Sequence, residues 1–255
     1  MKTSLERRLR TVGATLSLCT ALATSASADD ITKGVRGPTP LQLDDRVSYS
    51  QNEKGVQSFG NTLILKYWDG NQLGKWMFAS LPYRYVSSPT KETTGFGDLT
   101  LGGGPRGRIG NLHFLSYGAL TLPTGAEFIS AERTDLKLGT FVTYLTLDKK
   151  FEIDKSFEYT LTGETPQHVN PPNEFAFGFV VGRQITEKIK FAVGLTHLLK
   201  EDALTKEDPY LTNLRIVGRY TPSPTIHFET IIDVGIKSHE LPKGKSVTVL
   251  ARYNF

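Results

Sequence analysis

The sequence predicts an all-β fold, a transmembrane antiparallel up-and-down β-barrel of about twelve strands. Three observations predict it: apolar and polar side chains alternate with a period of two, short turns alternate with longer polar connections, and the chain begins like a secretory signal. After residue 28 no apolar run approaches the ~18 residues that a membrane helix needs. A barrel needs no such run, because its strands are ~9–11 residues long and apolar on one face.

The final segment shows the alternation most clearly. Apolar side chains occupy every second position from Val247 to Phe255, with Thr248 and Arg252 on the opposite face. The printed chain ends on Phe255, and Tyr253 stands two residues before it. Because this ending resembles the last strand of outer-membrane barrels, which the barrel assembly machinery reads, Tyr253 and Phe255 are the candidate assembly signal.

The same period recurs upstream, where Phe175, Phe177 and Phe179 alternate with small residues and where apolar residues alternate over 189–195. In a barrel such rows face lipid and the small residues line the lumen, whereas in a soluble β-sandwich the rows face a shared core. Alternation by itself leaves both folds open.

Connection lengths favour the barrel, because tight turns near 110–111, 148–150, 186–188 and 222–224 alternate with longer polar segments. A Greek-key sandwich would not keep this order. The strands are expected near 41–51, 56–68, 73–87, 95–109, 111–122, 136–148, 151–163, 173–185, 188–200, 209–221, 225–237 and 245–255.

Three segments divide the chain. Residues 1–28 combine a basic start, an apolar stretch from Val12 to Ala23 and a small-residue ending at Ala28, which predicts a signal peptide cleaved after that residue. Residues 29–40 look irregular, and the order of turns assigns 41–255 to the barrel.

Removal of the signal changes the charge balance. The whole chain has 30 basic and 26 acidic residues, but residues 29–255 keep 26 and 25, a net charge of +1. This balance gives no support to a nucleic-acid partner. The single cysteine, Cys19, leaves with the signal, so the expected mature chain has no disulfide.

Charged residues on the predicted inner face are the candidate functional residues. They either form structural pairs that fill a narrow barrel or make a charged constriction that selects solutes by sign and size. Arg215 and Arg219 are expected to lie beside Glu229 and Asp233 on the next strand. The full set is Lys66, Asp98, Arg215, Arg219, His227, Glu229, Asp233, Lys237 and Arg252.

Two patterns have competing interpretations. The tyrosines and tryptophans, among them Trp68 and Trp76, fall near predicted strand ends and suit interfacial aromatic girdles, although aromatics favour strands of any kind. In the strand over 151–163, Lys155 interrupts an apolar row, which a bulge, a strand end above the membrane or an error in register would explain.

The sequence gives no support to an enzyme. No histidine is followed by serine two residues later, the local form in which a strand would present a base and a nucleophile. His227 and Glu229 share a face, but no third metal ligand is evident, and we expect neither metal nor cofactor. The glycine run over 102–107 lacks the following Lys-Ser/Thr of a phosphate loop and more plausibly relieves crowding in the barrel.

Two short motifs carry a resemblance to a known family. Gly95, Gly97 and Asp98 form one motif, and Pro123-Thr124-Gly125 forms the other. Together they resemble a bacterial family labelled after the meta-pathway of phenol degradation, whose members look like outer-membrane transporters. The resemblance implies uptake of small, aromatic or hydrophobic compounds.

The expected function is therefore an outer-membrane channel for passive passage of small solutes. Its expected partners are outer-membrane lipid, the barrel assembly machinery and a small-molecule solute. The alternative is a closed structural or adhesive barrel that acts through its extracellular loops.

Overall fold

The computed structural model describes residues 41–69, 73–126, 129–166, 171–201 and 208–255. The predicted signal peptide and the irregular segment 29–40 lie outside the described residues. The described strands are β1 (Leu41–Asn52), β2 (Gln57–Trp68), β3 (Leu73–Ser88), β4 (Lys91–Phe96), β5 (Leu99–Ile109), β6 (Leu112–Leu122), β7 (Asp135–Leu145), β8 (Phe151–Leu161), β9 (Asn173–Gln184), β10 (Ile189–Glu201), β11 (Tyr210–Tyr220), β12 (Ile226–His239) and β13 (Gly244–Asn254).

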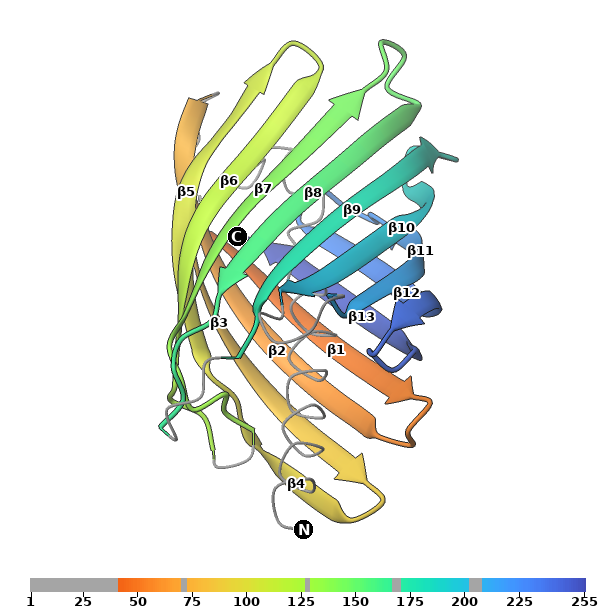
Figure 1. Cartoon of the computed structure of the whole chain (residues 1–255). Helices are drawn as coiled ribbons and strands as arrows, with labels where there is room; N and C mark the ends of the chain where they lie inside the picture. The colour runs from red at the N-terminus through yellow and green to blue at the C-terminus, as the bar shows by residue number, and fades with distance from the viewer. Residues whose placement is uncertain (1–40, 70–72, 127–128, 167–170, 202–207) are drawn as a thin grey trace.

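Twelve of these strands close into a barrel (Figure 1). Each strand of the wall pairs in antiparallel fashion with its neighbours along the chain, and β1 closes the ring by pairing with β13. The remaining strand, β4, pairs with the end of β3 and extends the wall beyond the ring. The predicted fold class is confirmed. The wall is a single closed sheet, so the alternative of a two-sheet sandwich is wrong.

Side chains alternate between the two faces of this wall. On β10, Phe191 and Val193 are 49% and 44% exposed, while Ala192 between them is 4% exposed. Apolar side chains thus cover the outside, and small or polar side chains turn inward, which is the arrangement of a barrel that sits in lipid. Among the described residues no helix is long and apolar enough to cross a membrane.

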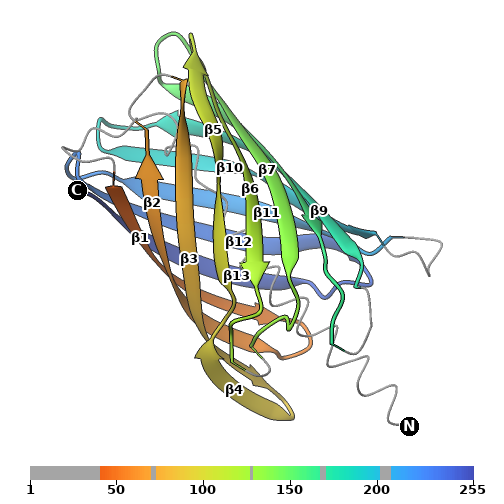
Figure 2. The same cartoon turned by 90° about the vertical axis from the view of Figure 1, so that its left-hand side faces the viewer.

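The two ends of the barrel differ (Figure 2). One end, called here the short-turn end, carries the hairpin turns at 110–111, 146–150, 185–188 and 221–225. The other, the long-loop end, carries the β3–β4 extension and the connections 123–134 and 162–172. The connection expected over 238–244 is shorter than predicted, because β12 continues to His239 and leaves only 240–243 between the strands.

One predicted strand is divided in two. In place of the expected strand over 95–109, β4 ends at Phe96 and β5 begins at Leu99. The chain turns at Gly97-Asp98, where the Gly97 amide donates to the Pro82 carbonyl at 2.8 Å. The alternating pattern runs through this corner, so the pattern alone does not reveal it.

The irregular apolar row on β8 has a simple structural cause. The β7–β8 and β8–β9 registers are continuous, with Lys155 opposite Val142 on one side and Phe179 on the other. Lys155 is exposed and lies at the fifth of eleven positions of β8. A bulge and an error in register are therefore both wrong, and a lysine does stand on the apolar outer surface.

Candidate functional site

Five aromatic side chains form a cluster inside the barrel, on β2, β3, β6 and β7. The rings of Trp68 and Trp76 stack at 5.4 Å, and those of Trp76 and Phe78 stack at 5.0 Å. Tyr117 meets the Trp76 and Phe78 rings edge-on and stacks on Phe141 at 6.0 Å. This set is called the aromatic cluster below. The girdle interpretation is wrong for both tryptophans, because they are 1% and 3% exposed and point inward.

Glycines on neighbouring strands make room for these rings. A Cβ atom at Gly102 would lie 2.6 Å from Cε1 of Phe78, and one at Gly139 would lie 2.2 Å from Cε1 of Tyr117. Rings that lie flat on a glycine backbone cover it from solvent, a known device in sheets. Gly102 in the glycine-rich stretch of β5 therefore serves aromatic packing, whereas a Cβ at Gly103 or Gly104 would meet the backbone of a neighbouring strand.

Replacing Gly139 with valine is expected to lower the free energy of unfolding by about 1–3 kcal/mol, because the new side chain overlaps the Tyr117 ring. The displaced ring would also lose the hydrogen bond that its hydroxyl donates to Glu158. Urea unfolding in detergent, followed by tryptophan fluorescence, measures the change. Gly218→Val is the matched control, since a Cβ there meets no atom within 4 Å. Equal effects of the two variants would contradict the steric explanation.

The aromatic cluster borders a cavity inside the barrel, with about 1020 Å³ of empty space that is partly open to solvent. Polar side chains share its wall, including Ser80, Lys66 and Asp98. Two residues of the β6–β7 connection, Ile129 and Ala131, also line it. The cavity thus combines aromatic faces with a few polar groups, the usual composition of a small-molecule site.

A charged group lies beside the aromatic cluster and is centred on Asp44 of β1, which is fully buried. Arg252 of β13 donates to both carboxylate oxygens at 2.8 and 3.0 Å, and Lys66 of β2 lies at 2.9 Å. Arg46 lies 3.6 Å from the same carboxylate. Gln42 connects this charged group to the aromatic cluster, because it donates to Asp44 at 2.9 Å and accepts from Trp68 Nε1 at 2.8 Å.

A second charged group lies on β8 and on β10 to β12, and β13 separates it from β1. Arg215 donates to both oxygens of Asp233 at 2.8 and 2.9 Å. Arg219 donates to Glu229 at 2.8 Å and lies 3.7 Å from Glu152, which also accepts from Lys190. All of these residues except Asp233 line a second cavity, with about 670 Å³ of empty space that is partly open to solvent.

Most of the predicted inner-face charges are found in these two groups. Lys66 and Arg252 belong to the first, and the two arginine–carboxylate pairs of β11 and β12 belong to the second. His227 is 4% exposed and hydrogen-bonds Thr221 at 2.8 Å. Among the described residues no group of three His, Cys, Asp or Glu side chains could hold a metal ion.

Lys237 is an exception, since the expectation that it faces the lumen is wrong. The β11–β12 register shifts between Thr212 and Asn213, so that Lys237 pairs with Thr212 on the outer face. It is exposed, and its ammonium lies 5.7 Å from the centre of the Tyr210 ring. One extra residue in β12 reverses the face of every later side chain.

Several inner residues were not predicted. Asp44, Glu152 and Lys190 each lie on the face of their strand opposite to the exposed apolar row, so the period of two contains the signal. The aromatic cluster has a weaker signal, because β2 and β3 carry apolar residues on both faces.

The two family motifs meet in space at the long-loop end. Asp98 accepts hydrogen bonds from the amides of Gly125 at 3.0 Å and Ala131 at 2.7 Å. Thr124 Oγ1, which follows Pro123, accepts from the Leu99 amide at 2.9 Å. The motifs therefore join the β4–β5 corner to the β6–β7 connection.

Close backbone contact explains the glycines of these motifs. A Cβ atom at Gly125 would lie 2.8 Å from the carbonyl carbon of Gly97. A Cβ at Gly97 would lie 2.9 Å from Pro82, and one at Gly95 would lie 2.7 Å from the Ala126 methyl. No side chain fits at these points.

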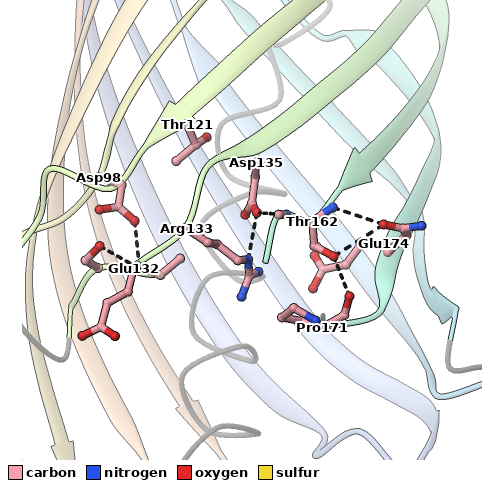
Figure 3. A network of polar contacts seen from close by, with 12 residues as sticks. Asp98, Thr121, Glu132, Arg133, Asp135, Thr162, Pro171 and Glu174 are labelled. Atoms are coloured by element: carbon pink, nitrogen blue, oxygen red, sulfur yellow. Dashed lines mark hydrogen bonds and ion pairs between the residues drawn. The ribbon is translucent and has the colours of Figure 1, made fainter. Parts of the chain in front are cut away.

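A polar network continues from this contact around the mouth (Figure 3). Arg133 donates to Asp135 at 2.8 Å, and the same carboxylate oxygen accepts the Gly163 amide at 3.0 Å. Thr162 Oγ1 donates to the Pro171 carbonyl at 2.6 Å. The β6–β7 and β8–β9 connections are thus held to one another.

The candidate assembly signal lies on the outside of β13. Tyr253 and Phe255 are 46% and 41% exposed, and their rings meet edge-to-face at 4.9 Å. The Phe255 amide donates to the Leu41 carbonyl at 3.1 Å, which extends the closing strand pair. Recognition of these residues by assembly machinery stays a prediction.

Comparisons with known proteins agree on the fold. Residues 45–236 match the model of the family described as "Putative MetA-pathway of phenol degradation". An outer membrane channel from Pseudomonas putida F1 is similar at 16% identity and a TM-score of 0.73, over 88% of this chain and 98% of that one. The NanC porin is similar at 14% identity and a TM-score of 0.57, over 84% and 100% of the two chains.

A third similar structure is the translocator domain of the autotransporter NalP from Neisseria meningitidis. Its identity is 11% and its TM-score 0.57, over 95% of this chain and 97% of that one. No curated protein sequence matches this chain. At these identities the solved structures establish the barrel fold alone.

Proposed function

The chain belongs to the MetA-pathway of phenol degradation family, and from that premise we propose that it is an outer-membrane channel for passive passage of small aromatic solutes. The observation that carries the proposal is the aromatic cluster, which borders a cavity inside a closed barrel. The interiors of porins are polar as a rule. The inward aromatic rings therefore favour a solute that can pack against an aromatic face.

The chemistry of the cavity suits a substituted benzene ring. A solute ring that packs edge-on or offset against Phe78 or Tyr117 gains about 0.5–1.5 kcal/mol beyond its area burial. Polar side chains such as Ser80 and Lys66 share the same cavity and can bind a hydroxyl or carboxylate substituent. Weak binding of this kind concentrates a solute and still lets it leave.

The outer surface supports placement in the outer membrane. Exposed apolar side chains cover the wall, as the lipid-facing band of a membrane barrel requires. In such barrels the short turns face the periplasm and the longer loops face outward, and both chain ends of the barrel lie on the periplasmic side. We infer the same orientation here, with a cleaved signal peptide for export.

The charged groups have a supporting role in this proposal. Each predicted arginine on β11 has a carboxylate directly opposite it on β12, so these two pairs present both signs in equal number. Such paired charges fill and order the barrel, and they do not favour a cation or an anion strongly. The group around Asp44 differs, because it sets three cations beside one carboxylate and so carries an excess of positive charge.

The fluorescence of the protein offers a direct test. The chain has two tryptophans, and both belong to the aromatic cluster. We expect titration with 4-nitrophenol to quench their emission to saturation, in protein purified from outer membranes, while glucose does not. Phe78→Leu should weaken binding by about two- to tenfold, because it keeps an apolar side chain and removes the ring.

Flux measurements complete the test. Liposomes that contain the protein should take up small phenols faster than empty vesicles do. They should also take up small phenols faster than sugars of similar size. Phe191→Leu, the same change on the outer surface, serves as the control and should leave both binding and flux unchanged. A folded barrel that conducts no ions and passes no solute would overturn the channel and favour the structural or adhesive alternative.

A further inference from the structure

The β6–β7 connection turns inward over the aromatic cavity. Ile129 and Ala131 of this connection line the cavity together with Phe78 and Tyr117 of the wall. Ile129 also lies near the β4–β5 corner, where its Cγ2 atom is 3.6 Å from the point that a Cβ on Gly97 would occupy. The connection therefore forms part of the boundary of the cavity.

The inward position depends on one carboxylate. Asp98 is 9% exposed, and its two oxygens accept one amide from each arm of the connection, Gly125 on one side and Ala131 on the other. Hydrogen bonds to a carboxylate are stronger than those between neutral groups. A single side chain thus holds the connection at two points six residues apart.

Further contacts fix the same geometry. The Ala126 amide donates to the Phe96 carbonyl at 2.8 Å, and Thr124 Oγ1 accepts the Leu99 amide. Within the connection, the amides of Ile129 and Ser130 both donate to the Ala126 carbonyl. These contacts join the described residues on the two sides of the connection, so that Ile129 has a defined position.

We propose that Asp98 is a specificity-determining residue, which positions Ile129 at the edge of the aromatic cavity and so fixes the size of the largest solute that passes. The inference rests on the proposed function, since it assumes that solutes cross at this cavity. It assigns a role to the two family motifs, because together they form the latch between Asp98 and the 123–134 connection.

Two variants release the latch by different means. Asp98→Ala removes both acceptors, and Gly125→Val places a side chain against the Gly97 backbone. For both we expect higher ionic conductance in planar bilayers and loss of the wild-type size cut-off for a graded series of alkylphenols in liposomes. Glu132→Gln is the matched control, since Glu132 is exposed on the same connection, and it should behave like the wild type.

A third variant narrows the passage and keeps the latch. Ile129→Trp leaves Asp98 and its two amide donors in place and adds bulk to a side chain that lines the cavity. We expect the size cut-off to move to smaller phenols and the conductance to fall. This variant tests the proposal even if the latch variants fail to fold, because it changes no residue of the wall.

The outcomes separate the two proposals. An unchanged size cut-off in a folded Asp98→Ala or Ile129→Trp protein, with phenol flux intact, would overturn the latch and leave the channel. A wild-type protein that conducts ions but passes no phenol, with conductance that rises in Asp98→Ala, would support the latch and overturn the aromatic cargo. Heat-modifiable migration on gels verifies folding in each case.

Discussion

Replacing Asp44 with leucine is expected to lower the free energy of unfolding by about 3–5 kcal/mol. Asp44 is fully buried, and three cations, Arg46, Lys66 and Arg252, lie within 3.6 Å of its carboxylate. Without the carboxylate, the three cations repel one another at close range, and each loses the negative charge that offsets the cost of its burial. The loss should exceed that of any surface ion pair.

Urea unfolding in detergent or liposomes measures this loss. Asp45→Leu is a close control, since Asp45 is the next residue, is less buried and turns to the outer face, where it accepts a hydrogen bond from Asn61 at 2.8 Å. Leucine suits a surface that faces lipid, so the control should change stability by less than about 1 kcal/mol. Similar values for the two variants would sink the argument from buried charge.

Replacing Lys155 with leucine is expected to raise the free energy of unfolding by about 2–4 kcal/mol, the cost of a lysine near the middle of a lipid-facing wall. Lys155 is exposed between Val142 and Phe179, and it stands at the centre of β8. Its removal completes an apolar row that runs from Ile153 to Phe157.

Reversible unfolding should be measured in phospholipid vesicles, because a detergent micelle does not reproduce the depth at which the side chain lies in a bilayer. Lys188→Leu, a change of the same kind in an exposed turn, should have almost no effect. If Lys155→Leu also leaves the free energy of unfolding unchanged, the ammonium reaches the lipid headgroups along its flexible stem and does not destabilise the protein.

The strands were predictable because each one repeats a simple pattern and each hairpin turn is short. The same reasoning predicted the pairs of β11 and β12, since a short turn fixes which residues face each other. It failed at Lys237, because a single extra residue shifts the register and leaves no mark in the pattern.

The parts that could not be predicted depend on contacts between distant segments. Asp98 binds amides 27 and 33 residues away, and the two motifs reveal this only once the chain is folded. The inward direction of Trp68 could have been predicted, because it lies two residues after Lys66, a predicted inner residue, on the same face of β2. It was missed because a tryptophan near a strand end also suits an interfacial girdle. Trp76 has a weaker signal, since both faces of β3 carry apolar residues.

The pair between Asp44 and Arg252 joins residues 208 positions apart, on the first and last strands of the ring. Every other strand of the wall can pair as soon as its neighbour along the chain is present, but this contact exists only in a complete circle. A chain that stops short of β13 would keep the contacts of Lys66 and Arg46 with Asp44. It would also leave an open, unpaired edge on β1. The salt bridge therefore requires that β1 and β13 have paired and the ring has closed.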